Sequence, residues 1–385
     1  MRFADNRNKI GKYIPAVVFL IFIYGMALWF VFSPKPDYSS SEKRYLQKFP
    51  EVTAEKLLSG EFGSEFETFF ADRFPQRNTW VGLNAYTALA VGNNGASGVY
   101  NCKNGYLINK PVSTENNLDK NIGAVADFAK SIDTPTTVML VPSTGYIVDD
   151  VLPTFHDKYN DDEDISKISS TLSKDKIGFV DLRERFKSEY KNGSQLYYKT
   201  DHHWTTKGAY TGYQELCKAL GITPIDDSTL KKDSYPDFYG TTYSSSGFWL
   251  TPPDNIEIWN NPKNSDRNIS VKITEGANVK TSGSMYFTDH LKEDDKYPVF
   301  IDGNHALTEI TNTNAKNGTI LLIKDSFSHS LAPFLAENYS KVVLVDLRYY
   351  KESVSDLVTT YNPEQVVVLY GIDNLATDTD IVWLK

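Results

Sequence analysis

Residues 319–328 read Thr-Ile-Leu-Leu-Ile-Lys-Asp-Ser-Phe-Ser and join a short apolar run to a polar turn. Such a run is typical of a strand that is buried on both faces of a sheet. A helical pattern follows directly at 328–337. This order places Ser326 at the carboxyl edge of a parallel sheet, where open α/β folds build their sites. Ser326 is therefore either a nucleophile beside free helix N–H groups or simply the cap of that helix.

Strands and helices alternate on both sides of this segment. We expect further strands at 136–141, 177–182, 341–346 and 365–370. Helical patterns lie between them, at 165–172, 206–220 and 353–361. The alternation predicts βαβ units, and therefore an α/β fold whose mainly parallel sheet is flanked by helices.

A second polar segment, residues 198–208, reads Tyr-Lys-Thr-Asp-His-His-Trp-Thr-Thr-Lys-Gly. A serine attacks well when a base takes its proton and a carboxylate orients that base. Asp201 and His203 are two residues apart, so one loop can supply both groups. A purely structural Asp–His pair is one alternative, and a metal site that includes His202 is another. We predict no metal, because adjacent histidines point apart on an extended chain and no further ligand lies nearby in the sequence.

Together, these segments resemble the SGNH-hydrolase superfamily. The resemblance is to its permuted branch of DHHW proteins and alginate-acetylation proteins of the AlgX/AlgJ type. Asp-His-His-Trp stands at 201–204, and Lys324-Asp325-Ser326 takes the place of a Gly-Asp-Ser block, with lysine instead of glycine. Gly-Ile-Asp-Asn at 371–374 resembles the Gly-x-Asn-Asp block with its last two residues reversed. The serine block follows the Asp–His block here, whereas it opens the domain in ordinary members.

The resemblance covers roughly residues 42–385 and implies a fold and a set of residue roles. The fold is a three-layer, circularly permuted parallel sheet flanked by helices. Ser326 is the implied nucleophile, His203 the general base and Asp201 the carboxylate that orients it. The backbone N–H of Ser326 is one implied oxyanion donor. Further oxyanion or substrate contacts are expected from Asn374, Asn304 and Arg348. For Arg348, a structural salt bridge is the alternative.

Residues 13–32 form a run of 20 residues without a charged side chain. That length suffices to cross about 30 Å of hydrocarbon. Four basic residues and one acidic residue precede the run, so the positive-inside rule places the N-terminus in the cytoplasm and the rest outside. A cleaved signal peptide is the alternative. We expect an uncleaved signal anchor, because the run is longer than a usual signal h-region and no clear cleavage motif follows it.

These features divide the sequence into segments. We predict a cytoplasmic tail (1–12), a transmembrane helix (13–32), a linker (33–41), a membrane-proximal helical segment (42–95), and an extracytoplasmic domain (96–385) with a loop-rich insertion (221–300).

Charge and cysteine content exclude several classes of function. The chain carries −9 overall and residues 1–32 carry +3, which leaves −12 on the remainder. This excess of negative charge after residue 32 argues against nucleic acid as a partner. Cys102 and Cys217 are too few for a disulfide framework; they form one bridge or remain buried thiols. No pattern predicts a cofactor.

Three functions fit this sequence. The resemblance implies an O-acyltransferase that acetylates a cell-surface polysaccharide through an acyl-serine intermediate. It also implies a membrane-bound O-acyltransferase as the partner that supplies acetyl groups across the bilayer. A carbohydrate acetylesterase with the same triad is the second possibility. The third is a non-catalytic protein that binds glycan or acts as a scaffold. Lys324 and the reversed order of Asp373 and Asn374 favour this third possibility.

Overall fold

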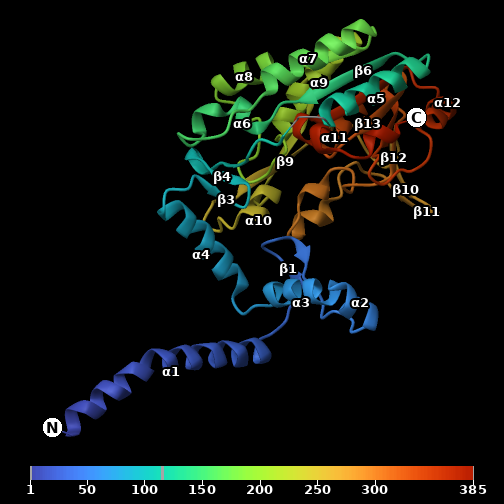
Figure 1. The fold of residues 1–385 in the computed structure, drawn as a ribbon. Coiled ribbons are helices and arrows are strands. Elements are labelled where there is room, and N and C mark those ends of the chain that lie inside the picture. The colour runs from blue at the N-terminus through green and yellow to red at the C-terminus, as the bar shows by residue number, and fades with distance from the viewer. Residues whose placement is uncertain (1, 114–116, 385) are drawn as a thin grey trace. The chain divides into compact units, whose positions relative to one another are not determined.

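The computed structural model describes residues 2–113 and 117–384 (Figure 1). Met1 of the predicted tail and Lys385 of the predicted domain lie outside these ranges. The chain divides into two compact units, residues 1–87 and 88–385. The finer segment boundaries given above stay predictions.

The first unit begins with the long helix α1 (Arg2–Phe32). Its segment Lys12–Phe32 is long and apolar enough to cross a membrane by length and composition, which fits a single-pass anchor or a signal sequence. Short elements follow: β1 (Tyr38–Ser39), β2 (Arg44–Tyr45), α2 (Ala54–Ser59), α3 (Glu61–Asp72) and α4 (Arg77–Ala90). Pro75 lies between α3 and α4. It separates the two helices, because proline is not tolerated in a helix interior.

The second unit is built on a sheet of eight strands. Their order across the sheet is β11 (Asn278–Ser282), β10 (Ile269–Glu275), β12 (Leu307–Asn312), β14 (Tyr339–Val345), β13 (Asn317–Lys324), β15 (Gln365–Gly371), β6 (Thr136–Val141) and β7 (Gly178–Asp181). The five strands from β14 to β7 are parallel, and the three before them are antiparallel.

The strand order is that of a permuted sheet. β15, from the C-terminal part of the chain, pairs in parallel with β6, and Val366 lies opposite Thr136. The serine strand β13 sits beside β15 at the centre. The predicted α/β fold with a circularly permuted parallel sheet is therefore confirmed.

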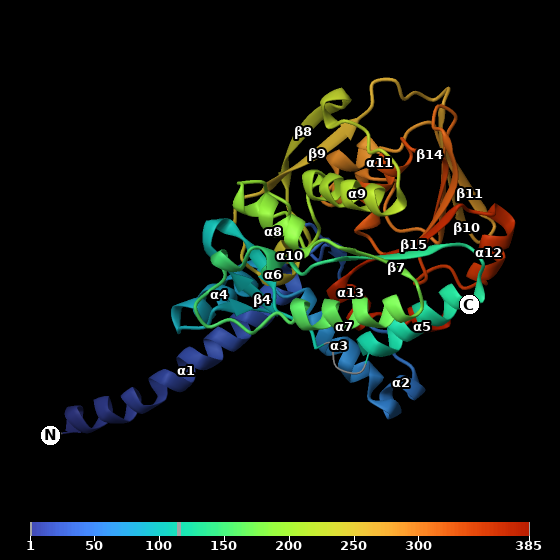
Figure 2. The ribbon, with the colours of Figure 1, turned by 90° about the horizontal axis from the view of Figure 1, so that it is seen from above.

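Helices cover both faces of the sheet, which makes three layers (Figure 2). Side chains alternate between the faces with a period of two: Ile320 and Leu322 point into one core, and Leu321 and Ile323 into the other. The first core is closed by α6 (Thr144–Ile147), α8 (Arg183–Lys191), α9 (Thr206–Leu220) and α11 (Ser328–Leu335). The second is closed by α5 (Asn117–Ser131), α7 (Asp161–Lys174), α12 (Val354–Tyr361) and α13 (Ile372–Thr377).

The segment predicted as a loop-rich insertion contains regular structure. It holds the antiparallel pair β8 (Lys231–Phe238) and β9 (Asp254–Asn260), the helix α10 (Thr241–Ser246), and two strands of the main sheet, β10 and the edge strand β11. The sequence of residues 299–301 predicts a short strand before Asn304, and this prediction is wrong. Tyr297–Val299 forms a 3-10 turn, and Ile301 has a φ of +49°, which a strand cannot contain.

A small separate sheet precedes the parallel strands. It consists of β3 (Gly95–Ala96), β4 (Val99–Asn101) and β5 (Leu107–Asn109). The Asn104-Gly105 dipeptide predicts a hairpin turn, because both residues tolerate positive φ. The prediction is confirmed: β4 and β5 pair antiparallel, and the two residues between them have φ of +58° and +78°.

Cys102 and Cys217 are both buried and unpaired. Burial raises the pKa of each thiol to about 12. The structure therefore has two inert core thiols rather than a bridge.

Candidate active site

Ser326 lies in the tight turn between β13 and α11, at the carboxyl edge of the sheet. Its exposed fraction is 9%, so that little more than an edge of the residue reaches solvent. The preceding residue, Asp325, fixes the turn. Its carboxylate accepts hydrogen bonds from the backbone N–H of Phe327 (2.9 Å) and Gly371 (2.7 Å) and from Asn374 Nδ2 (2.7 Å). One buried carboxylate thus joins the serine turn to the end of β15.

The loop before α9 brings Asp201 and His203 to Ser326. Residues 201–203 form a bend, so the two side chains turn to the same side. His203 Nδ1 lies 2.5 Å from Asp201 Oδ1, and His203 Nε2 lies 2.7 Å from Ser326 Oγ. An ionised carboxylate can only accept, so Nδ1–H donates to Asp201 and Nε2 accepts from the serine hydroxyl. The structure therefore joins the three residues in one chain of hydrogen bonds.

Asp201 is buried, and its charge is balanced by several donors. The backbone N–H of His203 donates to Oδ1 (2.8 Å), while the N–H and the hydroxyl of Thr241 donate to Oδ2 (2.6 and 3.1 Å). Burial alone would raise the pKa of Asp201. The two neighbouring histidines and the hydrogen bonds outweigh it and hold this pKa well below its usual range. Asp201 is thus a carboxylate at neutral pH, as its place beside His203 requires.

Two aromatic side chains, Tyr297 and Trp204, connect the histidine loop with the serine turn. Tyr297 stacks on it with ring centroids 3.9 Å apart and an interplanar angle of 11°. The Tyr297 hydroxyl also donates to the carbonyl oxygen of Ser326 (3.1 Å). The fully buried Trp204 donates from Nε1 to the carbonyl of Phe327 (3.0 Å) and contacts Ser330 Oγ (2.9 Å). Both rings therefore tie the histidine loop to the serine turn.

His202 lies in the same bend, and the expectation that the two histidine rings point apart is wrong. Their centroids are 3.9 Å apart, because the backbone here is bent rather than extended. Ligand atoms of Asp201, His202 and His203 consequently lie within 4.8 Å of one another. Both oxygens of Asp201 and Nδ1 of His203 are, however, already engaged in the hydrogen bonds described above. The donor set therefore fits hydrogen bonding better than metal binding.

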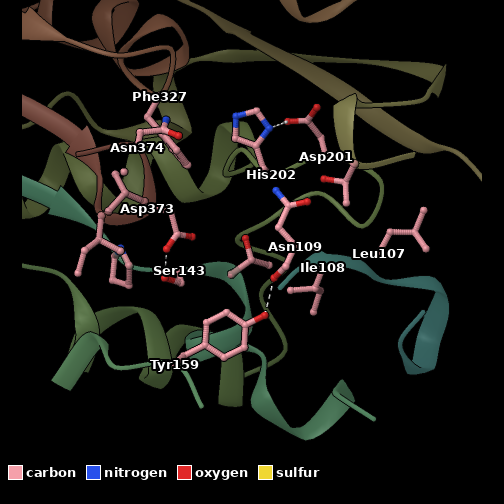
Figure 3. Close-up of a pocket in the computed structure, with 17 residues that line it drawn as sticks. Leu107, Ile108, Asn109, Ser143, Tyr159, Asp201, His202, Phe327, Asp373 and Asn374 are labelled. Carbon is pink, nitrogen blue, oxygen red and sulfur yellow. Dashed lines mark hydrogen bonds and ion pairs between the residues drawn. The ribbon is translucent and has the colours of Figure 1, made fainter. Parts of the chain in front are cut away.

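A small pocket opens beside these residues (Figure 3). Its volume is about 50 Å³. His202, Phe327 and Asn374 line one side, and Asn109 and Ser143 line the other. Of the described residues that line it, none is a lysine or an arginine. The pocket is thus polar but offers no positive charge.

Two acids stand at the rear of the pocket: Asp373 lines it and is half-buried, and Asp161 is buried behind it. Ser143 donates from its hydroxyl to Asp373 Oδ1 (3.1 Å) and from its backbone N–H to Asp161 Oδ1 (2.7 Å). Burial raises the pKa of Asp373 to about 7, and the charge of Asp161 adds to this effect. Burial raises the pKa of Asp161 to about 6. The reversed Asp373-Asn374 order of the sequence thus places the amide at Asp325 and a carboxyl at the rear of the pocket.

The other residues predicted for the site lie in a second polar network. Asn304 Oδ1 accepts from Arg348 Nη2 (2.9 Å), and Arg348 forms an ion pair with Asp346 (2.6 Å). Asp346 also pairs with the buried Lys324 (2.9 Å), whose Nζ lies 2.8 Å from His329 Nε2. No contact between described residues joins Asn304 or Arg348 to Ser326, His203 or Asp201. Lys324 therefore forms a buried ion pair with Asp346 next to the serine turn.

Several site residues escape sequence reasoning. Tyr297, Thr241 and Gly240 all come from the segment predicted as an insertion. A Cβ on Gly240 would lie 2.1 Å from Asp201 Cβ, so that only glycine allows this approach. The signal available in the sequence is the Gly240-Thr241 pair, which is typical of a turn entering a helix.

A family profile described as DHHW protein matches residues 108–345. A DHHW family protein from Eubacterium siraeum has a similar solved structure, with 17% identity, a TM-score of 0.63, and coverage of 75% of this chain and 95% of that one. PatB1 of Bacillus cereus, solved with a sulfonyl adduct, shares 21% identity with a TM-score of 0.61 and coverage of 74% and 97%. No curated protein sequence matches.

A third structure, the O-acetyltransferase domain of Pseudomonas putida AlgJ, shares 14% identity. Its TM-score is 0.48, and the match covers 75% of this chain and 95% of that domain.

The approach of Gly240 to Asp201 generates a first prediction. Gly240→Ala should displace the carboxylate and slow the modification of Ser326 by a sulfonyl fluoride about 100-fold, because small misplacements of an orienting group carry such costs. The rate is measured by intact-mass spectrometry of the full chain in detergent. Gly123→Ala is the control, since a Cβ there meets nothing within 4 Å. Equal rates in both variants would contradict the role given to Gly240.

The acids behind the pocket generate a pH prediction. A folded pKa near 7 for Asp373 means that the native chain holds a proton that the unfolded chain releases above about pH 4. Stability should therefore fall as pH rises from about 4 to 7, by at most about 1.4 kcal/mol per pH unit. Asp373→Asn should reduce the stability difference between pH 5 and pH 8 by about 1–3 kcal/mol in urea unfolding.

The control for this experiment is Asp127→Asn, whose carboxylate is 80% exposed. It should keep the pH dependence of the wild type. An Asp373→Asn protein with the same pH dependence as the wild type would show that Asp373 is ionised in the folded protein at pH 5.

Proposed function

This chain belongs to the DHHW family, and on that premise we propose that it is a membrane-anchored extracytoplasmic O-acyltransferase. Its proposed reaction is the O-acetylation of a cell-surface polysaccharide through an acyl-serine intermediate. The observation that carries the proposal is the continuous chain of hydrogen bonds from Asp201 through His203 to Ser326. This geometry is the one that activates a serine hydroxyl for attack on an ester.

In the proposed first half of the reaction, Ser326 Oγ attacks the carbonyl carbon of an acetyl donor. His203 Nε2 takes the serine proton, and Asp201 stabilises the imidazolium. When the donor's ester bond breaks, the same proton passes to the leaving oxygen. Acetyl-Ser326 remains, and the charges of all groups are restored.

The oxyanion that forms during this attack needs N–H donors. We assign the backbone N–H of Ser326, since no backbone carbonyl of the described residues accepts from it. Asn374 is the second candidate. One hydrogen of its amide goes to Asp325, which leaves the other for the oxyanion. Asn304 and Arg348 remain proposals for substrate contacts at the edge of the site.

In the proposed second half, a sugar hydroxyl attacks acetyl-Ser326, and His203 again takes and returns one proton. If water attacks instead, the same site is an acetylesterase, which is the second candidate function. Sulfonyl capture is a suitable chemical probe, because PatB1 has been solved with a sulfonyl adduct. A non-catalytic role in glycan binding would not explain why Ser326 is hydrogen-bonded to His203.

The anchor and the partner complete the proposal. We propose that residues 13–32, within the apolar helical segment Lys12–Phe32, span the cell membrane once with the N-terminus in the cytoplasm. A membrane-bound O-acyltransferase would then pass acetyl groups across the bilayer to Ser326. We propose that the reaction needs neither a metal nor a cofactor, since the three side chains supply nucleophile, base and orienting charge.

The acyl-serine step is tested on the full chain in detergent with 4-nitrophenyl acetate. Peptide mapping should place one acetyl group on Ser326 in the wild type and none in Ser326→Ala. His203→Ala should slow its formation by at least about 1000-fold, because the base is lost. Ser188→Ala is the control, because Ser188 is an exposed serine of α8 outside the pocket. Acetylation that is unaffected by His203→Ala would contradict the mechanism.

The anchor is tested in membranes. The full chain should resist extraction by alkaline carbonate, and a tag at the N-terminus should be protected from protease added outside spheroplasts. A protein of full mass that carbonate releases would contradict the anchor. A shortened protein beginning after residue 32 would show that the helix is a cleaved signal peptide.

A further inference from the structure

His202 is the residue of the Asp-His-His-Trp motif to which the proposed mechanism gives no task. Its Nδ1 lies 2.6 Å from Thr241 Oγ1 and 3.7 Å from Asp201 Oδ1. Its polar contacts with other described residues all involve this one nitrogen. The second ring nitrogen, Nε2, therefore has its hydrogen-bonding capacity left for a ligand.

The protons in this contact can be counted. Thr241 has one hydroxyl hydrogen, and it donates that hydrogen to the ionised Asp201, which can only accept. The Thr241 oxygen must then accept from His202, so the proton of the His202 ring resides on Nδ1. Partial burial of the ring lowers the pKa of His202 to about 4, so the ring is neutral at pH 7. Nε2 consequently carries a lone pair.

The position of this lone pair is also defined. The side chain of His202 is 28% exposed, and it lines the pocket. Figure 3 shows its second nitrogen turned toward the side that holds Phe327 and Asn374. The ring lies 3.9 Å from the ring of His203. A hydrogen-bond acceptor with fixed orientation thus stands next to the base that activates the attacking hydroxyl.

We propose that His202 Nε2 accepts a hydrogen bond from the hydroxyl adjacent to the one that attacks acetyl-Ser326, so the site selects acceptors that carry a vicinal diol. This inference rests on the proposed acyl transfer and specifies its acceptor. The attacking hydroxyl has a single hydrogen, which goes to His203. His202 can therefore engage only a second donor, and two adjacent rings suit two adjacent hydroxyl groups.

The rest of the pocket agrees with a neutral polyol. Asn109 and Asn374 offer amide groups, and the buried Thr242, whose hydroxyl has no hydrogen-bond partner among the described residues, also lines the cavity. The absence of lysine and arginine among the described lining residues disfavours an anionic acceptor group. No proton is transferred to His202 at any stage, so the acyl transfer remains balanced as written above.

The test compares two acceptors within each protein. The full chain in detergent is acetylated with 4-nitrophenyl acetate in the presence of either cyclohexane-1,2-diol or cyclohexanol, and the acetylated alcohols are quantified. The wild type should transfer to the diol about tenfold faster per hydroxyl, as expected from one additional hydrogen bond. In His202→Phe, which keeps a ring beside His203, the ratio should fall to about one.

His202→Gln is the second variant, because its amide oxygen can still accept a hydrogen bond. It should retain a preference for the diol between those of the wild type and His202→Phe. Each ratio is internal to one protein, so a change in the acylation rate cancels.

The outcomes distinguish a failure of the proposed acyl transfer from a failure of the proposed role of His202. Lack of any acetyl-Ser326 in the wild type overturns the proposed function and this inference with it. Acetyl-Ser326 with a diol preference that His202→Phe leaves intact overturns this inference alone, as does equal transfer to both alcohols by the wild type.

Discussion

The buried charge of Asp201 is the constraint on which the arrangement of this site depends. A carboxylate removed from water is tolerated only when donors surround it. Here those donors come from the Asp201 loop itself and from Thr241, forty residues later in the chain. Gly240 must lack a side chain to let that second segment approach. The requirement to satisfy one charge thereby fixes the direction of the His203 ring, and with it the hydrogen bond to Ser326.

The predictable part of this protein lies where the information is local. The strand that ends at Lys324, the turn at Ser326 and the Asp201–His203 spacing are contiguous patterns, and the structure brings them together. Tyr297 and Thr241 could not be foreseen, because their contacts depend on how an irregular segment returns to the sheet. The close approach of the His202 and His203 rings is unpredictable for a related reason. The bend at 201–203 is imposed by the hydrogen bonds to Asp201, and residue preferences alone do not reveal it.

Lysine at position 324 shows how a motif can change without loss of its geometry. Its ammonium group is buried and meets Asp346, which Arg348 also holds, while its stem completes the end of β13. Burial lowers the pKa of Lys324, and the attraction of Asp346 opposes that effect. The ion pair of Lys324 and Asp346 therefore stabilises the end of β13 next to the serine turn. Arg348 and Asn304 connect this buried pair with the protein surface.

The pairing of β15 with β6 has a consequence for the order of events in biosynthesis. The paired residues Thr136 and Val366 are about 230 positions apart, so the sheet closes only after nearly the whole chain has been made. Before that moment the serine turn does not exist beside the histidine loop. A nascent chain therefore does not yet hold Asp201, His203 and Ser326 in one chain of hydrogen bonds. This arrangement forms late, when the first and last parallel strands meet.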